Sequence, residues 1–243
     1  MSHVLLLAGS GEARALAARL PRETDHRLTL SFADAPRVAR DLDVPIRTGG
    51  FGGAEGFIEY LRDQQVDAVI NATHPFAARI TRRTARICAD LGMPHLRLLR
   101  PGWTAGPGDR WQFVADPQAA AALIRPGQVV FVASGRETLP ALEHSGARIT
   151  CRQIDMPAAP FPFPGGDYLQ GTPPFSVEEE VALFKRLGVE VLLVKNAGGA
   201  ASRSKLDAAR ALGIKVLLLE RPADTACHTV GDVDAAVEWA RSL

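Results

Sequence analysis

Residues 4–14 are VLLLAGSGEAR, an apolar run followed by a glycine-rich turn and the first residues of an amphipathic stretch. Such a run predicts a buried strand over 4–8, and the stretch after it predicts a helix over 12–20. Gly9 and Gly11 permit close backbone approach, and the helix N-terminus would offer unpaired N–H groups and the positive end of the helix dipole. The segment therefore predicts a strand–turn–helix unit able to hold a phosphate, although an ordinary strand-to-helix turn shows the same two glycines.

The same alternation of apolar runs and amphipathic stretches continues along the chain. Further strands are expected at 28–32, 45–47, 68–71, 95–98, 129–133, 148–153, 191–194 and 215–219, and further helices at 54–65, 76–91, 137–143, 177–187 and 204–212. Short apolar runs separated by helices are typical of strands buried on both faces of a parallel sheet. The pattern predicts an α/β fold with two Rossmann-like domains, residues 1–125 and 126–243, mainly parallel sheets and an interdomain cleft.

Two segments rich in Gly and Pro interrupt this alternation. Residues 100–109, RPGWTAGPGD, cannot continue a helix or strand and are expected to begin the passage between the domains, with the boundary near Arg125. Residues 156–174 are expected to form a long connection without regular structure. This connection fits either a lid over a cleft or a spacer packed on the surface by its own Phe residues.

Composition narrows the range of partners. Lys plus Arg number 28 against 27 for Asp plus Glu, which leaves a net charge of +1. So balanced a chain shows no sign of a nucleic-acid partner or of binding to an anionic membrane surface. The apolar segment 4–8 is far too short for a secretory signal, and no apolar run approaches the length of a membrane span, so we expect a cytoplasmic protein.

Residues that bind metals or form covalent intermediates do not cluster in the sequence. Cys88, Cys151 and Cys227 lack the short spacings of a zinc site or a redox pair, and the six histidines are scattered. No nucleophile elbow accompanies a histidine and an aspartate in the order of a hydrolase triad. We expect structural thiols in a reducing compartment, no metal site and no covalent acyl chemistry.

A second set of polar residues follows the strand expected at 68–71. Residues 71–76 are NATHPF, which places Thr73 and His74 at the carboxyl edge of the sheet, where open α/β sheets bind ligands. Pro75 fits the first position of the next helix. The two side chains are therefore candidates to face a cofactor. The same residues also fit a plain turn in which Thr73 caps the helix and His74 faces solvent.

Two strand ends in the second half carry similar groups. Glycines, hydroxyls and cations follow the strands at 129–133 and 191–194, and they suit phosphate or carboxylate oxygens. Each turn on its own is also compatible with a capped turn that carries solvated charges. The candidates for contacts with an anionic ligand in this half are Ser134, Gly135, Arg136, Lys195, Asn196, Ser202 and Lys205.

Read together, several motifs resemble the precorrin-6A reductase family. They are AGSGEAR at 8–14, NATHPFA at 71–77, SGR at 134–136, VKNAGG at 194–199, SKL at 204–206 and ERP at 220–222. Their order and spacing match as well, so the resemblance covers nearly the whole chain. It implies a monomeric enzyme that moves a hydride from NADPH to the precorrin-6A macrocycle, a tetrapyrrole, to give precorrin-6B in cobalamin biosynthesis. Alternatives are the cobalt-precorrin-6A reductase of the anaerobic route, a non-catalytic NADP(H)-binding module and a sugar-nucleotide transferase.

The resemblance and the strand-end motifs together nominate site residues. Arg136, Lys195 and Lys205 are assigned to the substrate's acetate and propionate groups, and His74 is the candidate proton donor. His74, Lys195 and Arg136 are together the candidate catalytic residues. Residues assigned to NADPH are Gly9, Ser10, Gly11, Glu12, Ala13, Ser31, Arg37, Thr73, His74, Pro75 and Phe76.

Two residues near the end of the second strand bear on the choice between NADPH and NADH. Asp34 stands where an acidic side chain would bind the ribose 2′-hydroxyl of NAD, and Arg37 follows closely. We favour Arg37, which with the Ser31 hydroxyl can bind a 2′-phosphate, because the strand is expected to end at Phe32 and leave Asp34 past the ribose.

Overall fold

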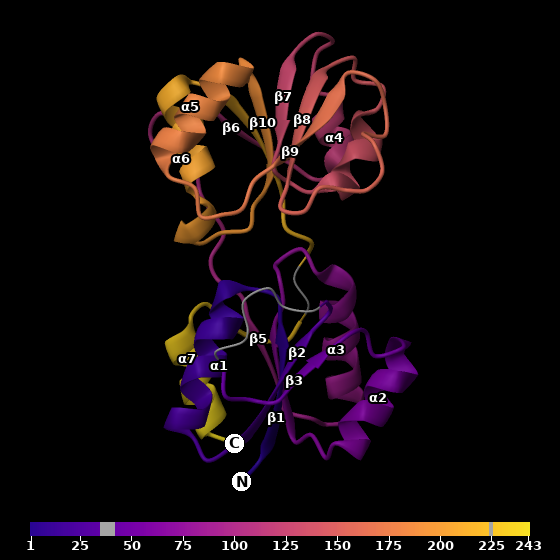
Figure 1. The fold of residues 1–243 in the computed structure, drawn as a ribbon. Coiled ribbons are helices and arrows are strands. Elements are labelled where there is room, and N and C mark those ends of the chain that lie inside the picture. Colours follow the sequence, from indigo (N-terminus) through magenta and orange to yellow (C-terminus); the bar gives the residue numbers. More distant parts are fainter. Residues whose placement is uncertain (35–41, 224–225) are drawn as a thin grey trace. The chain divides into compact units, whose positions relative to one another are not determined.

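The computed structural model describes residues 1–34, 42–223 and 226–243. It divides into two compact units (Figure 1). Unit 1 consists of Met1–Pro101 together with Pro222–Leu243, and unit 2 is Gly102–Arg221. Each unit contains one six-stranded sheet, so the predicted α/β fold with two parallel sheets is confirmed.

Unit 1 is a parallel sheet covered by helices on both faces. Its strands lie in the order β12-β5-β4-β1-β2-β3. One core joins α1 and α7 to the sheet, and another joins α2 and α3 to the opposite face (Figure 1). The elements are β1 (His3–Ala8), α1 (Gly11–Glu23), β2 (Arg27–Phe32), β3 (Ile46–Thr48), α2 (Gly53–Asp63), β4 (Ala68–Ala72), α3 (Ala78–Asp90), β5 (His95–Leu98), β12 (His228–Val230) and α7 (Val233–Arg241).

Unit 2 repeats this architecture. Its parallel strands lie in the order β6-β11-β10-β7-β8-β9, and α5 and α6 pack on one face through Phe184 and Leu206. The elements are β6 (Trp111–Val114), α4 (Pro117–Ala121), β7 (Val129–Val132), the 3₁₀ helix η1 (Arg136–Leu142), β8 (Arg148–Gln153), β9 (Gly166–Gln170), α5 (Val177–Leu187), β10 (Val191–Lys195), the 3₁₀ helix η2 (Ala200–Ser202), α6 (Ser204–Leu212) and β11 (Lys215–Leu219).

Each sheet takes one edge strand from the other half of the chain. β6 follows β5 in the sequence but pairs with β11, and β12 follows β11 but pairs with β5. The predicted boundary near Arg125 therefore differs from the observed division, because 102–125 belong to unit 2 and 222–243 return to unit 1. The physical reason is that both edge strands are short and partly exposed, so neither carries the continuous apolar run that marks a central strand.

Several elements differ in detail from the sequence-based expectation. The helix expected at 76–91 begins at Ala78, and Pro75 and Phe76 form a turn before it. The helix expected at 137–143 is the 3₁₀ helix η1, which contains Pro140. Residues 156–174 are not free of regular structure, because they contain β9. In that segment Phe161 packs against Phe163 and Tyr168, each at 4.9 Å between ring centroids, which favours the packed spacer over the lid.

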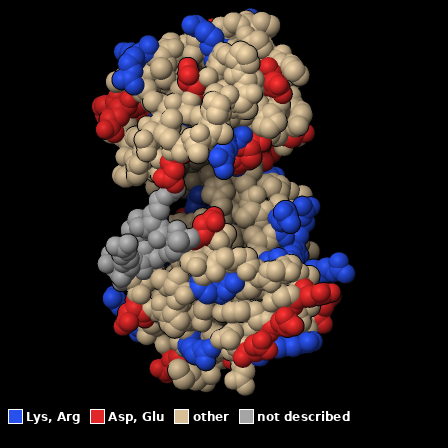
Figure 2. Space-filling model, turned by 45° about the vertical axis from the view of Figure 1, so that its right-hand side comes forward, with Lys and Arg blue, Asp and Glu red and all other residues tan. Residues whose placement is uncertain are grey.

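The described residues include no helix long and apolar enough to cross a membrane. They also include no group of three or more His, Cys, Asp or Glu side chains placed to hold a metal ion. Side chains of both charge signs occur on each unit in the face that Figure 2 shows.

Candidate functional site

The β1–α1 turn is built by Ser10. This residue is the N-cap of α1, and its hydroxyl accepts a hydrogen bond from the Ala13 N–H at 3.2 Å. The same hydroxyl donates to the Ala72 carbonyl oxygen at 2.9 Å, which ties the turn to the end of β4. Ala13 is fully buried and its N–H is used by this cap, so the structure gives Ala13 a role in the turn itself.

The two glycines of the turn differ in what requires them. A Cβ on Gly9 would lie 3.0 Å from the His74 nitrogen and 3.2 Å from the Thr73 Cα, so Gly9 lets the β4–α3 loop approach the turn. A Cβ on Gly11 would meet no protein atom within 4 Å. Gly11 is thus not needed for packing, and the open space beside it lies at a helix N-terminus, where an anion is favoured.

Glu12 follows the turn and is paired with Arg100. Its carboxylate lies 2.6 Å from the Arg100 guanidinium. Burial raises the pKa of Glu12, but the backbone hydrogen bond at the helix start and the Arg100 charge outweigh burial, so its pKa is lowered. The Glu12 carboxylate, predicted to contact the cofactor, is therefore paired with the Arg100 guanidinium from the segment after β5.

A buried network shapes the loop after β4. Arg97, 1% exposed, donates to Asn71 Oδ1 at 2.6 Å and to Thr73 Oγ1 at 3.0 Å. Thr73 in turn donates from its hydroxyl to Asn71 Oδ1 at 2.8 Å, and Asn71 donates to Thr81 Oγ1 on α3. Thr73 therefore does not cap α3, whose N-cap is Ala77. The network fixes the loop that ends beside Gly9.

His74 is oriented by its own loop. Its Nδ1 accepts a hydrogen bond from the Phe76 N–H at 3.2 Å, and its carbonyl oxygen accepts one from the Ala77 N–H at 2.8 Å. A ring whose Nδ1 accepts from a backbone N–H carries the hydrogen of its neutral form on Nε2. In this tautomer Nε2 carries the hydrogen, and the proton-donor role of His74 stays a prediction.

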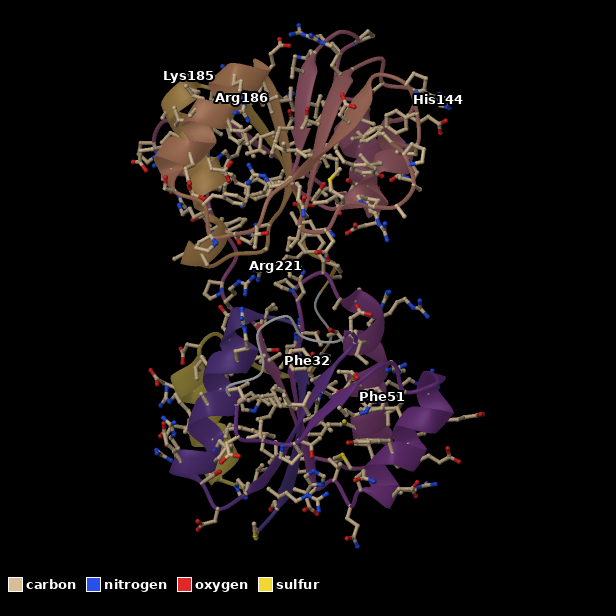
Figure 3. The ribbon with its side chains drawn as sticks, in the orientation of Figure 1. Phe32, Phe51, His144, Lys185, Arg186 and Arg221 are labelled. Carbon is tan, nitrogen blue, oxygen red and sulfur yellow. The ribbon has the colours of Figure 1, made fainter. Side chains whose placement is uncertain are left out.

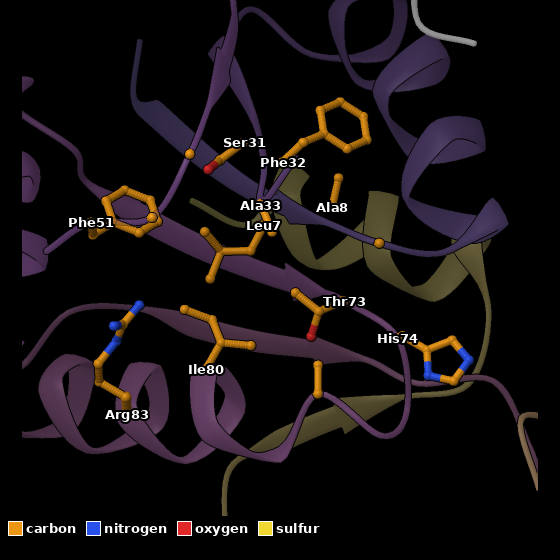
Figure 4. A pocket seen from close by; sticks show the side chains of 14 residues that line it. Leu7, Ala8, Ser31, Phe32, Ala33, Phe51, Thr73, His74, Ile80 and Arg83 are labelled. Carbon is orange, nitrogen blue, oxygen red and sulfur yellow. The ribbon is translucent and has the colours of Figure 1, made fainter. Parts of the chain in front are cut away.

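A cavity of about 280 Å³ opens beside these loops at the carboxyl edge of the first sheet (Figure 4). Strand ends and the loops after them supply its walls: Gly9 after β1, Ser31 on β2, Gly49 to Phe51 after β3, Thr73 and His74 after β4. Apolar side chains such as Leu7 and Ile80 line it, and Arg83 enters from α3. This is where a Rossmann-like sheet binds its nucleotide. Arg37 lies outside the described residues.

At the carboxyl edge of the second sheet, the predicted residues Ser134 and Gly135 help to form the turn after β7. The Thr138 hydroxyl donates to the Gly135 carbonyl oxygen at 2.8 Å, so in the 2.9 Å contact between the two hydroxyls Ser134 is the donor. Gly135 has φ +97°, and a Cβ there would collide with the Glu137 carboxylate. Arg136 is exposed at the start of η1, while Lys195 at the end of β10 forms an ion pair with Glu137.

The Asn196 side chain binds the backbone of Trp103, at the point where the chain enters unit 2. Its Oδ1 accepts from the Trp103 N–H at 2.7 Å, and its Nδ2 donates to the Trp103 carbonyl oxygen at 3.1 Å. The Trp103 indole donates to the Gly199 carbonyl oxygen at 2.9 Å. Arg221, labelled in Figure 3, donates to the carbonyl oxygens of Asn196 and Ala197. The Asn196 side chain predicted to contact substrate is therefore engaged in the fold.

Lys205 lines a smaller cavity of about 160 Å³ in unit 2, together with Ser202, Ser204 and Arg152. Its Nζ donates to the Ser202 carbonyl oxygen at 2.7 Å. Burial, with a smaller contribution from the nearby Arg152 charge, lowers the pKa of Lys205 to about 8 against the opposing effect of Glu180. Arg152 itself is held by Glu180 in a buried pair with contacts of 2.7 and 2.6 Å.

A family model described as "Precorrin-6x reductase CbiJ/CobK" matches residues 3–241. The chain belongs to this family. Relatives include the precorrin-6A reductases of Rhodococcus erythropolis, 42% identical over 100% of this chain and 99% of the relative, and of Mycobacterium tuberculosis, 37% identical over 100% and 99%. A cobalt-precorrin-6A reductase from Priestia megaterium is 25% identical over 90% of each chain.

A solved structure agrees with this assignment. The structure titled "CobK precorrin-6A reductase" superimposes with a TM-score of 0.92 at 34% identity, and the match covers 100% of this chain and 97% of that one. The sequence-based resemblance is therefore confirmed, and the protein is a reductase of the CbiJ/CobK family. Its family relationship implies a nicotinamide cofactor.

Sequence reasoning missed several residues that shape the two edges of this reductase. Arg97 and Trp103 organise the loops after β4 and β10, and Arg152 pairs with Glu180 beside Lys205. Arg83 lines the cavity of about 280 Å³ in unit 1. One signal in the sequence was usable: Arg97 and Arg152 are charged residues inside otherwise strand-like runs, where a charge needs a partner. The partners themselves lie far away in the chain.

Proposed function

We propose that the protein catalyses the NADPH-dependent reduction of precorrin-6A to precorrin-6B in cobalamin biosynthesis. The observation that carries this proposal is the full-length similarity to precorrin-6A reductases combined with a nucleotide-type edge in unit 1. Three relatives named cobalt-precorrin-6A reductase are 23%, 25% and 28% identical, against 42% and 37% for the two precorrin-6A reductases above. This difference favours the cobalt-free macrocycle as substrate.

The residues of unit 1 fit a dinucleotide. The Ser10-capped turn offers the start of α1 to a diphosphate, Gly11 leaves space for its approach, and the cavity between β2, β4 and α3 is large and apolar enough for an adenine ring. Bound NADPH would supply the hydride for the reduction. Gly9, Thr73 and the Arg97 network hold the β4 loop against the turn, so these residues would position the cofactor.

The basic residues of unit 2 are proposed to bind the anionic arms of the macrocycle. Arg136 is exposed, and Lys195 carries a charge that a substrate carboxylate can share with Glu137. Lys205 and Ser202 border the smaller cavity. Charge-assisted hydrogen bonds to such groups contribute about 1.5–3 kcal/mol each. The proton that completes the reduction comes from solvent or from a donor at the site, for which His74 is the candidate because its Nδ1 accepts from the Phe76 N–H and leaves the hydrogen on Nε2.

The decisive experiment is an anaerobic reaction of purified protein with precorrin-6A and NADPH. The proposal expects one NADPH oxidised per macrocycle and a product heavier by two hydrogen atoms. NADPH oxidation without a change in the mass of the macrocycle would exclude precorrin-6A as substrate. The cobalt-containing macrocycle is assayed in parallel, because faster turnover of that compound would assign the protein to the anaerobic route.

We further propose that the protein acts as a monomer in the cytoplasm without a nucleic-acid or membrane partner. The balanced charge of the chain supports this view, since anionic polymers and surfaces attract a clear excess of basic residues. Light scattering after size-exclusion chromatography tests the oligomeric state, and a mass twice that of the chain would contradict a monomer.

A further inference from the structure

Two arginines lie around one aromatic ring at the end of the cavity of about 280 Å³ in unit 1. Arg83 lines the cavity together with Ser31 and Phe51 (Figure 4). Its guanidinium carbon lies 6.0 Å from the centroid of the Phe51 ring. Arg47, on β3, lies 3.8 Å from the same centroid and donates to Ser31 Oγ at 3.0 Å. Two positive charges therefore gather where β2 and β3 end.

Neither charge is neutralised within residues 1–34, 42–223 and 226–243. The hydrogen bonds of Arg47 go to uncharged acceptors, namely Ser31 Oγ and the carbonyl oxygens of Gly49 and Gly50 at 2.8 and 3.0 Å. Arg83 has no acidic partner, and its Nε is buried without a hydrogen-bond partner in the same part of the chain. A buried donor of this kind costs free energy until an acceptor reaches it. An anion in the cavity would supply the acceptor and the opposite charge.

The position of the two arginines indicates which anion this is. Ser31 is the penultimate residue of β2, and in Rossmann-like sheets the end of this strand faces the ribose of the adenosine half of the dinucleotide. The apolar cavity walls suit the adenine ring, and the guanidinium of Arg83 suits a phosphate bound in a bidentate manner. A phosphate on the ribose 2′-oxygen distinguishes NADPH from NADH.

We propose that Arg83 binds the 2′-phosphate of NADPH and that Arg47 positions Ser31 and the turn from Gly49 to Phe51 around it. The two arginines then determine the preference for NADPH over NADH. This inference rests on the proposed function, because it assumes a nicotinamide dinucleotide at the first sheet. It assigns to Arg83 the contact that sequence analysis assigned to Arg37, which lies outside the described residues.

Calorimetric titration of the full-length protein tests the assignment without any turnover. The ligands are NADPH, NADH, adenosine 2′,5′-bisphosphate and adenosine 5′-monophosphate, the last two differing only in the 2′-phosphate. Arg83→Met should weaken NADPH and the bisphosphate by roughly tenfold to a hundredfold, the equivalent of one charge-assisted contact, and leave the other two nearly unchanged. Arg83→Lys should recover part of the loss, and it serves as the test variant if Arg83→Met does not fold.

The matched control is Arg82→Met. Arg82 is an exposed neighbour on α3 that does not line the cavity of about 280 Å³, although together with Arg83 it lines a separate, more open hollow at the start of α2 and α3. Its loss removes the same charge and should leave all four affinities nearly unchanged. Arg47→Met should also weaken the two ligands that carry the 2′-phosphate.

Three outcomes would overturn the assignment. Equal weakening of NADPH and NADH by Arg83→Met would place Arg83 at another part of the dinucleotide. Unchanged affinities in both Arg83 variants would mean that another residue binds the 2′-phosphate, and Arg37→Ala would be the next variant to test. If Arg82→Met weakened NADPH as much as Arg83→Met does, the loss would reflect the overall charge of the protein and not a contact of Arg83. Failure of the wild type to bind NADPH at all would instead contradict the proposed function, which keeps the two failures distinguishable.

Discussion

Gly11 provides the sharpest test of the nucleotide edge, because the fold does not require a glycine there. A Cβ at this position would meet no protein atom within 4 Å, and Gly11 is the first residue of α1. Gly11→Val should therefore fold like the wild type. Its side chain would occupy the space beside the helix N-terminus through which a diphosphate has to approach. We expect the variant to lose NADPH binding while it keeps the melting temperature of the unliganded wild type.

The magnitude follows from linkage between binding and unfolding. A ligand present at a hundred times its dissociation constant stabilises the native state by about 2.7 kcal/mol, which for a chain of this size corresponds to roughly 5–11 °C in melting temperature. Thermal denaturation with and without NADPH should show this shift for the wild type, none for Gly11→Val and an intermediate shift for Gly11→Ala. By contrast, Gly9→Ala should lower the melting temperature without ligand, since its Cβ would press on the His74 backbone. An equal NADPH shift in Gly11→Val and the wild type would refute the placement of the cofactor at this turn.

Three further predictions concern groups elsewhere in the chain. Lys195→Ala should raise the Michaelis constant for the macrocycle while NADPH affinity stays the same, and steady-state kinetics with calorimetry would contradict this if NADPH affinity collapsed instead. Because the pKa of Lys205 falls from its ordinary value of 10.5 to about 8 on folding, the folded state loses this proton first as pH rises. The Lys205 amine should thus make the free energy of unfolding rise with pH between about pH 8 and 10.5. Chemical denaturation should show this rise for the wild type and not for Lys205→Met, and equal pH dependences would contradict the burial of this amine. Burial raises the pKa of Cys88 to about 12 and of Cys151 to about 11, so a maleimide at neutral pH should label Cys227 first, and mass spectrometry would disprove this if either buried thiol reacted as fast.

Local features of the sequence were sufficient for the class of fold. The helix at 177–187 has the predicted bounds, because the capping box of Ser176 and Glu179 and the apolar periodicity act within one helix. The strands at 148–153 and 215–219 also have their predicted bounds, since their apolar residues mark them without reference to the rest of the chain. The motifs shared with the reductase family are local in the same sense.

The strand ends of unit 1 were predicted for the same reason, but the roles of their residues were not. Gly9 and Gly11 are equivalent in the sequence, yet only Gly9 is required by a neighbouring loop. Thr73 was a candidate helix cap, whereas Arg97 and Asn71 engage its hydroxyl. These outcomes depend on which strand lies beside which, and spacing along the chain does not contain that information.

The sequence by itself determined that the chain alternates strands and helices in two parallel sheets and that its motifs are those of a reductase family. Only the tertiary structure decided that β6 completes the second sheet and β12 the first. It also decided that Asn196 binds the entering segment at Trp103, and that Arg83 lines a cavity together with residues of β1, of β2 and of the turn after β3. The physical reason is the range of the interactions. Capping and periodicity act over a few residues, whereas edge-strand pairing and the burial of a charge are settled by groups that meet only when distant segments pack together.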